Sequence, residues 1–193
     1  MRSVCVFCGS SAGARPDYIE AARHLGALLA ARHLRLVYGG ARVGLMREVA
    51  DATRRAGGEV IGVIPDALRA LEVAHTELPD LRIVGSMHER KALMADLADA
   101  FIAIPGGAGT LEEFFEVWTW AQLGIHRKPC ALLNVAGYFY GLLTFLDHSV
   151  GERFLRHEHR AMVLVDDDPE RLLDRFATYR APDIQKWIGR NET

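Results

Sequence analysis

A cluster of glycines follows a short apolar run at residues 105–110, which read Pro-Gly-Gly-Ala-Gly-Thr. Without side chains, a glycine backbone can come within hydrogen-bonding distance of a ligand. The next residues have the pattern of a helix, and the first amide N–H groups of a helix have no partner within it, so they bind phosphate readily. We therefore predict a phosphate site made by Gly106, Gly107, Ala108, Gly109 and Thr110.

Glu113 lies three residues beyond Thr110, inside the predicted helix. This spacing is that of a capping box, in which the glutamate side chain accepts a hydrogen bond from the threonine amide. The alternative is that the carboxylate faces the bound ligand and takes part in chemistry. The residue pattern is compatible with both interpretations.

Two adjacent cations, Arg90 and Lys91, lie near the start of a second predicted helix. Ser86 and Glu89 have the spacing of a capping box at its first turn. The dipole of a helix disfavours positive charge there, so an anion should lie nearby to compensate. Both cations share with Met87 a helix face that should point toward the protein, which favours binding of an anionic ligand. The alternative is that they are surface cations whose apolar stems lie along the protein.

These residues must be positioned by a fold in which short apolar runs alternate with amphipathic helix patterns. Runs that are apolar on successive residues indicate strands buried on both faces, and alternation with helices indicates right-handed crossovers between parallel strands. We predict an α/β protein with a Rossmann-like, doubly wound parallel sheet and helices on both faces. The predicted strands lie in the runs SVCVFCG, RLVYGG, EVIGVIP, LRIVG, AFIAIPGG, CALLNV and AMVLVDD.

A single domain is predicted over residues 1–180, with residues 181–193 as a C-terminal tail, because no linker-like composition divides the chain. In a doubly wound sheet, ligands bind beyond the carboxyl ends of the strands. Three loops with glycines lie there, and Gly9, Gly39 and Gly106 are their first glycines. Each loop alone could be a tight turn, but together they predict one binding site.

The motifs that are missing restrict the ligand. A dinucleotide needs G-x-G-x-x-G after the first strand and an acidic residue after the second, but the chain has CGSSAG and then Tyr38-Gly39-Gly40. The loop G-x-x-x-x-G-K-[ST], which holds a triphosphate, is also missing. A monophosphate is the anion that remains.

The overall composition agrees with a protein that acts on a small ligand. The 193 residues carry a formal net charge of -2, which provides no basic field for nucleic acid or an anionic membrane surface. The longest apolar run falls short of the ~20 residues of a membrane helix, and the N-terminus lacks the features of a secretory signal. Three cysteines suit a reducing compartment, so we expect a cytoplasmic protein. Cys5 and Cys8 should point to opposite faces of one strand, which disfavours a redox or zinc pair.

The helix after the glycine cluster is predicted to be apolar on two sides. Leu111, Phe114 and Trp118 form a stripe that should face the sheet. Val117 and Trp120 lie on a second apolar side, which predicts contact with a second copy of the chain in a homodimer, or with another helix.

With these residues in view, the chain resembles the Lonely Guy family of cytokinin riboside 5'-monophosphate phosphoribohydrolases, whose members were often labelled lysine decarboxylases. MHERKALM and PGGAGTLEE are similar to the family's M-x-x-R-K and P-G-G-x-G-T-x-x-E signatures. CGSS, YGGARVGLM, TWAQLGIHRKP and LLNVAGYF match in the same order, so the resemblance covers roughly residues 3–150. Ala41 and Arg47 stand where the family usually has glycine, so the segment after the second predicted strand carries more side chains than is usual for the family.

The resemblance implies a Rossmann-like homodimer that hydrolyses the N-glycosidic bond of a nucleoside 5'-monophosphate, without a metal or cofactor. The products would be ribose 5-phosphate and a base, either adenine or an N6-modified adenine. The implied catalytic pair is Arg90 and Glu113. The carboxylate would stabilise positive charge on the sugar and orient water, and the guanidinium would clamp phosphate or ribose oxygens. The implied nucleotide contacts are Glu72, Met87, Lys91, residues 107–110 and Thr119.

Two other functions would use the same features. A non-catalytic protein that binds a nucleotide or a phosphorylated cofactor could have the same glycine loops, because fold does not dictate function. A lysine decarboxylase would need a lysine bound to pyridoxal phosphate, and Lys91, Lys128 and Lys186 are the only candidates. Release of free base distinguishes the hydrolase from both.

Overall fold

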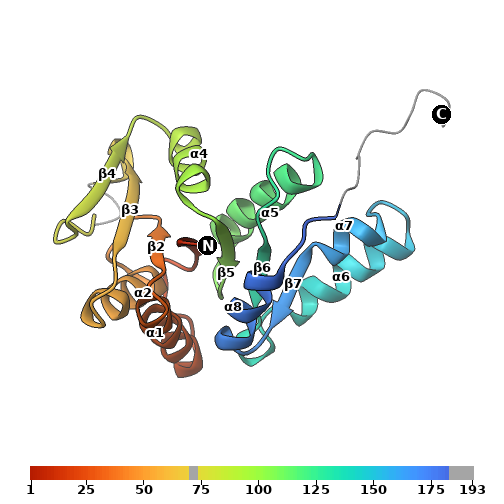
Figure 1. Ribbon diagram of the computed structural model, residues 1–193, viewed down its shortest axis with the longest axis horizontal. Coiled ribbons are helices and arrows are strands. Elements are labelled where there is room, and N and C mark those ends of the chain that lie inside the picture. The colour runs from red at the N-terminus through yellow and green to blue at the C-terminus, as the bar shows by residue number, and fades with distance from the viewer. Residues whose placement is uncertain (70–73, 183–193) are drawn as a thin grey trace.

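One seven-stranded parallel sheet organises the part of the chain that the computed structural model describes, residues 1–69 and 74–182 (Figure 1). Glu72 and most of the predicted C-terminal tail lie outside these residues. Six strands fall within the predicted apolar runs, and β4 begins one residue before its run, at Asp80, so the predicted α/β fold is confirmed. The strands are β1 (Ser3–Phe7), β2 (Arg35–Tyr38), β3 (Val60–Pro65), β4 (Asp80–Val84), β5 (Ala100–Ala103), β6 (Cys130–Leu133) and β7 (Val163–Asp166).

The order of the strands is β4-β3-β2-β1-β5-β6-β7. The chain first adds strands on one side of β1 and then returns to add β5, β6 and β7 on the other side. The helices that follow β1 and β5 lie on opposite faces of the sheet, although the two strands are neighbours. Ligands bind at such a reversal of strand order in open α/β sheets.

Helices cover both faces of the sheet, as the sequence predicts (Figure 1). They are α1 (Pro16–Ala31), α2 (Gly44–Arg55), α3 (Asp66–Arg69), α4 (Met87–Leu97), α5 (Ala108–Gln122), η1 (Val135–Gly137), α6 (Tyr140–Gly151), α7 (His157–Ala161) and α8 (Pro169–Thr178). The helices α1, α2 and α8 pack on one face, and α4, α5 and α6 pack on the other. Among the helices in the described ranges, none has both the length and the apolar character that crossing a bilayer requires.

The strand β1 divides its side chains between the two apolar layers. Val4 and Val6 pack with α1 and α2, whereas Cys5 and Phe7 pack with α4 and α5. Cys8 lies on the side of Val4 and Val6, so the two thiols are on opposite faces, as predicted. Both cysteines are free and buried.

The predicted second apolar side of α5 is wrong at Val117. Val117 is 2% exposed and lies in the same apolar cluster as Phe114 and Trp118. The residues at 114, 117, 118 and 121 have the i, i+3, i+4, i+7 spacing of one helix face, so the buried stripe is rotated from the predicted one. Trp120 is partly buried and packs against the same cluster.

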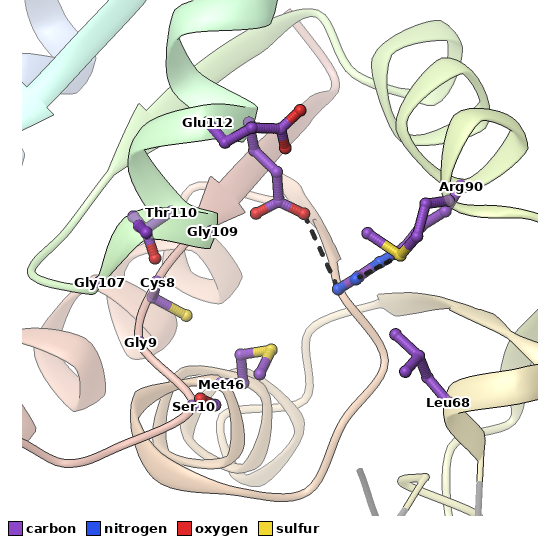
Figure 2. Close-up of a pocket in the computed structure, with 13 residues that line it drawn as sticks. Cys8, Gly9, Ser10, Met46, Leu68, Arg90, Gly107, Gly109, Thr110 and Glu112 are labelled. Atoms are coloured by element: carbon purple, nitrogen blue, oxygen red, sulfur yellow. Dashed lines mark hydrogen bonds and ion pairs between the residues drawn. The ribbon is translucent and has the colours of Figure 1, made fainter. Parts of the chain in front are cut away.

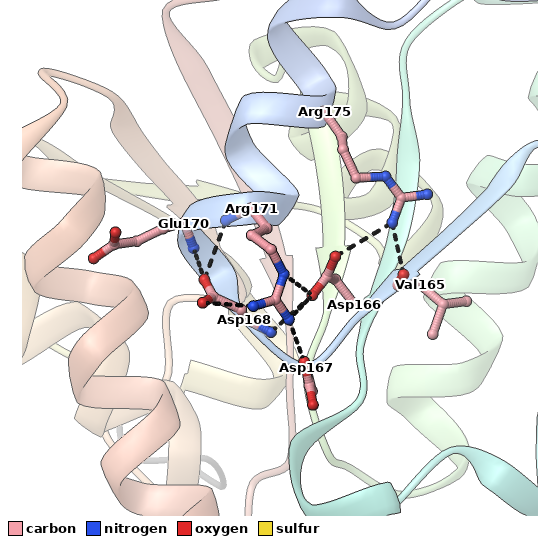
Figure 3. A network of polar contacts seen from close by, with 7 residues as sticks. All are labelled: Val165, Asp166, Asp167, Asp168, Glu170, Arg171 and Arg175. Atoms are coloured by element: carbon pink, nitrogen blue, oxygen red, sulfur yellow. Dashed lines mark hydrogen bonds and ion pairs between the residues drawn. The ribbon is translucent and has the colours of Figure 1, made fainter.

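Charged side chains fix α8 to the end of β7 (Figure 3). Asp168 is the N-cap, and its Oδ1 accepts hydrogen bonds from the amides of Glu170 (2.7 Å) and Arg171 (3.1 Å). Arg175 Nη1 donates to the carbonyl of Val165 at 2.7 Å. An N-cap aspartate satisfies amides that the helix leaves free, so these charges have a structural role.

Candidate active site

Three glycine loops meet at the carboxyl edge of the sheet. The Gly9 amide donates to the carbonyl of Pro105 (3.0 Å), which joins the loops after β1 and β5. The Leu45 amide donates to the carbonyl of Gly9 (3.0 Å), which brings the start of α2 to the same place. A Cβ on Gly44 would lie 2.3 Å from the carbonyl carbon of Ser10, so this approach requires glycine.

A cavity of about 300 Å³ opens where these loops meet (Figure 2). Its volume lies at the lower end of the range for small-molecule sites. Of the predicted site residues, the lining includes Met87, Arg90, Gly107, Ala108, Gly109, Thr110 and Glu113. It also includes Gly9, from the predicted glycine loop after β1, and Cys8, Ser10, Met46, Leu68 and Glu112, which the sequence did not assign to ligand binding.

The helix α5 begins at Ala108 with Gly107 as its N-cap, so Thr110 lies inside the helix. The capping-box interpretation of Glu113 is therefore wrong, because a capping box needs its threonine at the N-cap. Glycine has no side chain that could accept hydrogen bonds from the first amides of α5. These amides border the cavity, and the start of a helix of this kind can bind an anion.

The glycines between β5 and α5, and at the start of α5, differ in whether packing within the chain requires a glycine. A Cβ on Gly106 would lie 2.1 Å from Thr110 Oγ1, so packing within the chain excludes a side chain. A Cβ on Gly107 or Gly109 would meet no atom within 4 Å. Neither has a positive φ angle that would call for glycine. The absence of a side chain at Gly107 and Gly109 therefore leaves space for a ligand.

Arg90 reaches the cavity from the opposite side, with a side chain only 7% exposed. The alternative that it is a surface cation is wrong. Its Nη2 donates to the carbonyl of Gly39 at 3.2 Å, and its Nη1 lies 3.7 Å from Met87 Sδ. Among the described residues, the buried Nε has no hydrogen-bond partner. A buried donor without a partner is costly, so this atom is available to donate to a ligand oxygen.

Glu113 lines the cavity together with Arg90, with Oε1 3.8 Å from Arg90 Nη2 and 12% of its side chain exposed. The site therefore pairs one carboxylate with one guanidinium next to the N-terminus of α5. Cys8 lies beside them, and burial together with the charge of Glu113 raises the pKa of its thiol well above the ordinary value. Cys8 is thus an uncharged part of the wall.

Lys91 turns away from the cavity. Its Nζ lies 2.5 Å from Glu112 Oε1 and 3.1 Å from Glu116 Oε1, which connects α4 to α5. Burial lowers the pKa of Lys91, but the hydrogen bonds with Glu112 and Glu116 outweigh this effect and raise it. Ser86 caps α4 by accepting from the Glu89 amide (3.1 Å), as predicted, and this helix start places Arg90 and Lys91 in their different directions.

Of the remaining predicted contacts, those that the structure describes are not in the cavity lining. Thr119 is on α5, nine residues and thus about 14 Å beyond Thr110, and does not line the cavity. Gly106 supports the loop from behind, where its carbonyl accepts a hydrogen bond from the Tyr138 hydroxyl (2.6 Å). Glu72 is outside the described residues. Arg47 faces Asp51 on α2 (3.4 Å), and Ala41 pairs with Ala74, so these two departures from the family pattern lie outside the cavity lining.

Of the residues that the sequence did not assign, Ser10 carried the clearest signal, because it belongs to the CGSS motif that directly follows β1. Met46 and Leu68 carried none. An apolar residue next to a strand or helix end looks the same whether it faces the core or a ligand.

The fold and the site define a Rossmann-like α/β protein with a cavity at the topological switch point, bordered by Arg90, Glu113 and the start of α5. Residues 46–176 match the family model described as "Possible lysine decarboxylase". Over 178 residues, 92% of this chain and 78% of the relative, the chain is 53% identical to a probable cytokinin riboside 5'-monophosphate phosphoribohydrolase of Oryza sativa subsp. japonica. It is 50% identical to the cytokinin riboside 5'-monophosphate phosphoribohydrolase of Rhodococcoides fascians, over 94% of this chain and 90% of that one. The chain belongs to the Lonely Guy family of these enzymes.

A solved structure with a different role has the same fold. The molybdenum cofactor binding protein of Rippkaea orientalis matches with a TM-score of 0.68 and 22% identity, over 92% of this chain and 96% of that one. At this identity the likeness concerns the fold alone.

The space beside Gly109 can be tested with an alanine substitution, and Gly141 offers a matched control. Gly109 and Gly141 are each the second residue of a helix, and a Cβ on either meets no protein atom. Replacing either with alanine should raise the free energy of unfolding by up to about 1 kcal/mol, since alanine favours helix. Only Gly109→Ala should weaken the binding of substrate, because only its methyl group enters the cavity. Denaturant melts and steady-state kinetics check this, and unchanged KM and kcat in Gly109→Ala would contradict it.

Proposed function

We propose that this protein hydrolyses the N-glycosidic bond of a cytokinin riboside 5'-monophosphate, with Arg90 and Glu113 as its catalytic residues. Family membership supports the reaction, which makes the protein a hydrolase that acts on a nucleoside monophosphate. The observation that carries the choice of residues is a buried guanidinium beside a carboxylate, across one cavity from the free amides of α5.

The site suggests an orientation for the nucleotide. The phosphate would accept hydrogen bonds from the amides at the start of α5, where Gly107 and Gly109 leave space. The sugar would then lie between these amides and Glu113. Leu68, Met46 and Met87 provide apolar surface on the other sides of the cavity, which suits an adenine with an apolar N6 substituent.

The chemistry follows from this orientation. Breaking the bond between ribose C1' and the base nitrogen builds positive charge on the sugar. The carboxylate of Glu113 stabilises that charge and accepts a proton from the attacking water, whose oxygen bonds to C1'. The departing base takes the electron pair of the broken bond and a proton. Arg90 binds a sugar or phosphate oxygen through Nε and so holds C1' against the water.

The described lysines do not support a decarboxylase. A lysine that forms a Schiff base must first be neutral, whereas contacts with two carboxylates raise the pKa of Lys91. Lys128 Nζ donates to the carbonyl of Ala95 at 2.8 Å. Lys186 lies outside the described residues.

A homodimer is part of the proposal, although Val117 no longer supports it. Its support is the exposure of large apolar side chains, which marks interaction surfaces when they gather. Tyr140 and Phe145 on α6 are 68% and 61% exposed, and Ile125 after α5 is 66% exposed. Both helices lie on the same face of the sheet.

The phosphate assignment predicts a strong preference for nucleotides. Hydrolysis of N6-prenylated AMP should exceed that of the matching nucleoside by at least ~10²-fold in kcat/KM, because binding energy from the phosphate is used at the reacting carbon. Quantifying free base from N6-prenylated AMP, AMP, GMP, CMP and the nucleosides measures this. Equal values for nucleotide and nucleoside would refute the phosphate site, and binding without any release of base would identify a non-catalytic binding protein.

Glu113→Gln should separate catalysis from folding. Because glutamine keeps the size of glutamate and an oxygen that can face Arg90, the variant should stay folded and still bind AMP. Its kcat should fall by roughly 10²- to 10⁴-fold, since a neutral amide cannot accept a proton from water. Asp147→Asn, which removes a charge on α6 far from the cavity, serves as control. Turnover of Glu113→Gln within about threefold of the parent, well short of the usual acid-base contribution, would show that the carboxylate is dispensable.

The homodimer can be measured directly. Light scattering should give about twice the chain mass of 21.4 kDa. Phe145→Glu should shift the mass toward a single chain, because a buried charge without a partner disfavours association. A single-chain mass for the parent at micromolar concentration would remove the homodimer from the proposal.

A further inference from the structure

The orientation of Arg90 depends on one backbone carbonyl. Its Nη2 donates to the carbonyl of Gly39 at 3.2 Å, while the contact with Glu113 Oε1 is longer, at 3.8 Å. A Cβ on Gly39 would lie 2.0 Å from Nη2, so the guanidinium packs directly on this peptide. A shift of the Gly39 peptide would therefore move Arg90 relative to the cavity.

Both neighbours of Gly39 are held by the same residue, His75. The imidazole Nδ1 lies 2.9 Å from the Tyr38 hydroxyl. The His75 amide donates to the carbonyl of Gly40, also at 2.9 Å. Gly40 has a φ of +76°, so the chain turns sharply immediately after Gly39. His75 thus fixes the turn through a side-chain contact on one side of Gly39 and a main-chain contact on the other.

His75 is itself fully buried, and both ring nitrogens have polar neighbours. Nε2 lies 3.4 Å from Asp51 Oδ1 and 3.5 Å from Arg54 Nη1. Burial lowers the pKa of His75; Asp51 opposes this shift, and Arg54 adds to it. Two further charged groups have smaller effects: Glu77 raises the pKa of the imidazole, and Arg42 lowers it.

These shifts fit a defined set of hydrogen bonds. A neutral imidazole can direct Nε2–H at Asp51 and accept at Nδ1 from the Tyr38 hydroxyl. Burial also raises the pKa of Tyr38, which keeps its hydroxyl protonated as the donor. A satisfied polar network of this kind holds its members in one arrangement.

We propose that His75, through Tyr38, is a positioning residue for the hydrolysis: it holds the Gly39 carbonyl where that carbonyl orients the Arg90 guanidinium. This inference rests on the proposed function of Arg90. His75 does not line the cavity and does not touch the reacting atoms, so its effect on the reaction is transmitted by the turn.

The test uses substitutions on both sides of the contact between Tyr38 and His75; those at His75 also change its contacts with Asp51 and Arg54, whereas Tyr38→Phe does not. Tyr38→Phe removes the hydroxyl and keeps the buried ring, and His75→Ala removes the imidazole while its amide still donates to Gly40. His75→Asn places an amide group near the position of Nδ1 and should restore part of the effect. Thr53→Val is the control, because Thr53 is also a fully buried hydroxyl in this region and bonds only the Val49 carbonyl.

Kinetics with N6-prenylated AMP should show that the effect passes through Arg90. Tyr38→Phe and His75→Ala should lower kcat/KM by about 10- to 100-fold, the loss expected from a misplaced catalytic group. In an Arg90→Lys background, whose ammonium lacks the planar fork, the same changes should alter kcat/KM by less than about twofold, because coupled residues are not additive. Thr53→Val should leave kcat/KM at the parent value. Equal losses in both backgrounds would overturn the proposal.

A measurement without substrate separates this proposal from the function itself. The side-chain N–H resonance of Arg90, assigned by its loss in Arg90→Lys, should shift or broaden in Tyr38→Phe and His75→Ala but not in Thr53→Val. An unchanged Arg90 resonance in both variants would refute the positioning role, whatever the activity. A shifted resonance in a protein that releases no base would support the positioning role and refute the hydrolase.

Discussion

The burial of one positive charge constrains the whole site. A guanidinium stays protonated in proteins, so Arg90, with 7% of its side chain exposed, must find oxygen partners within the fold. It finds the Gly39 carbonyl at the end of β2 and the Glu113 carboxylate on α5. Lys91, one residue on, connects α4 to α5 through Glu112 and Glu116. The helix that carries the charge is thereby fixed to the helix that carries the carboxylate.

The same constraint explains what the sequence could predict. Seven apolar runs and their intervening helices define the sheet, because strands buried on both faces leave a pattern that few other structures produce. Arg90 and Lys91 look equivalent in sequence, since both are cations on one helix face. Only the positions of α5 and of the Gly39 turn decide that the first enters the cavity and the second binds carboxylates.

Other errors have equally local causes. Thr110 resembles an N-cap, but α5 begins two residues earlier at Ala108, and helix starts are poorly determined by spacing alone. The role inferred for His75 had no signal in sequence, because a single histidine gives no hint of a contact with Tyr38, 37 residues earlier. Long-range polar contacts of this kind are set by topology, which brings β2 beside the segment that follows α3.

The uncapped N-terminus of α5 and the Nε of Arg90, which has no hydrogen-bond partner among the described residues, also affect how long the protein persists in a cell. Both can donate hydrogen bonds to a bound anion, so a ligand that binds the folded chain makes it more resistant to unfolding, by an amount that grows with ligand concentration. Cellular proteases remove unfolded chains. The amount of this protein in the cell should therefore rise with the concentration of the nucleotide that stabilises it. A cell that makes the nucleotide would accumulate the protein that consumes it, without any change in synthesis.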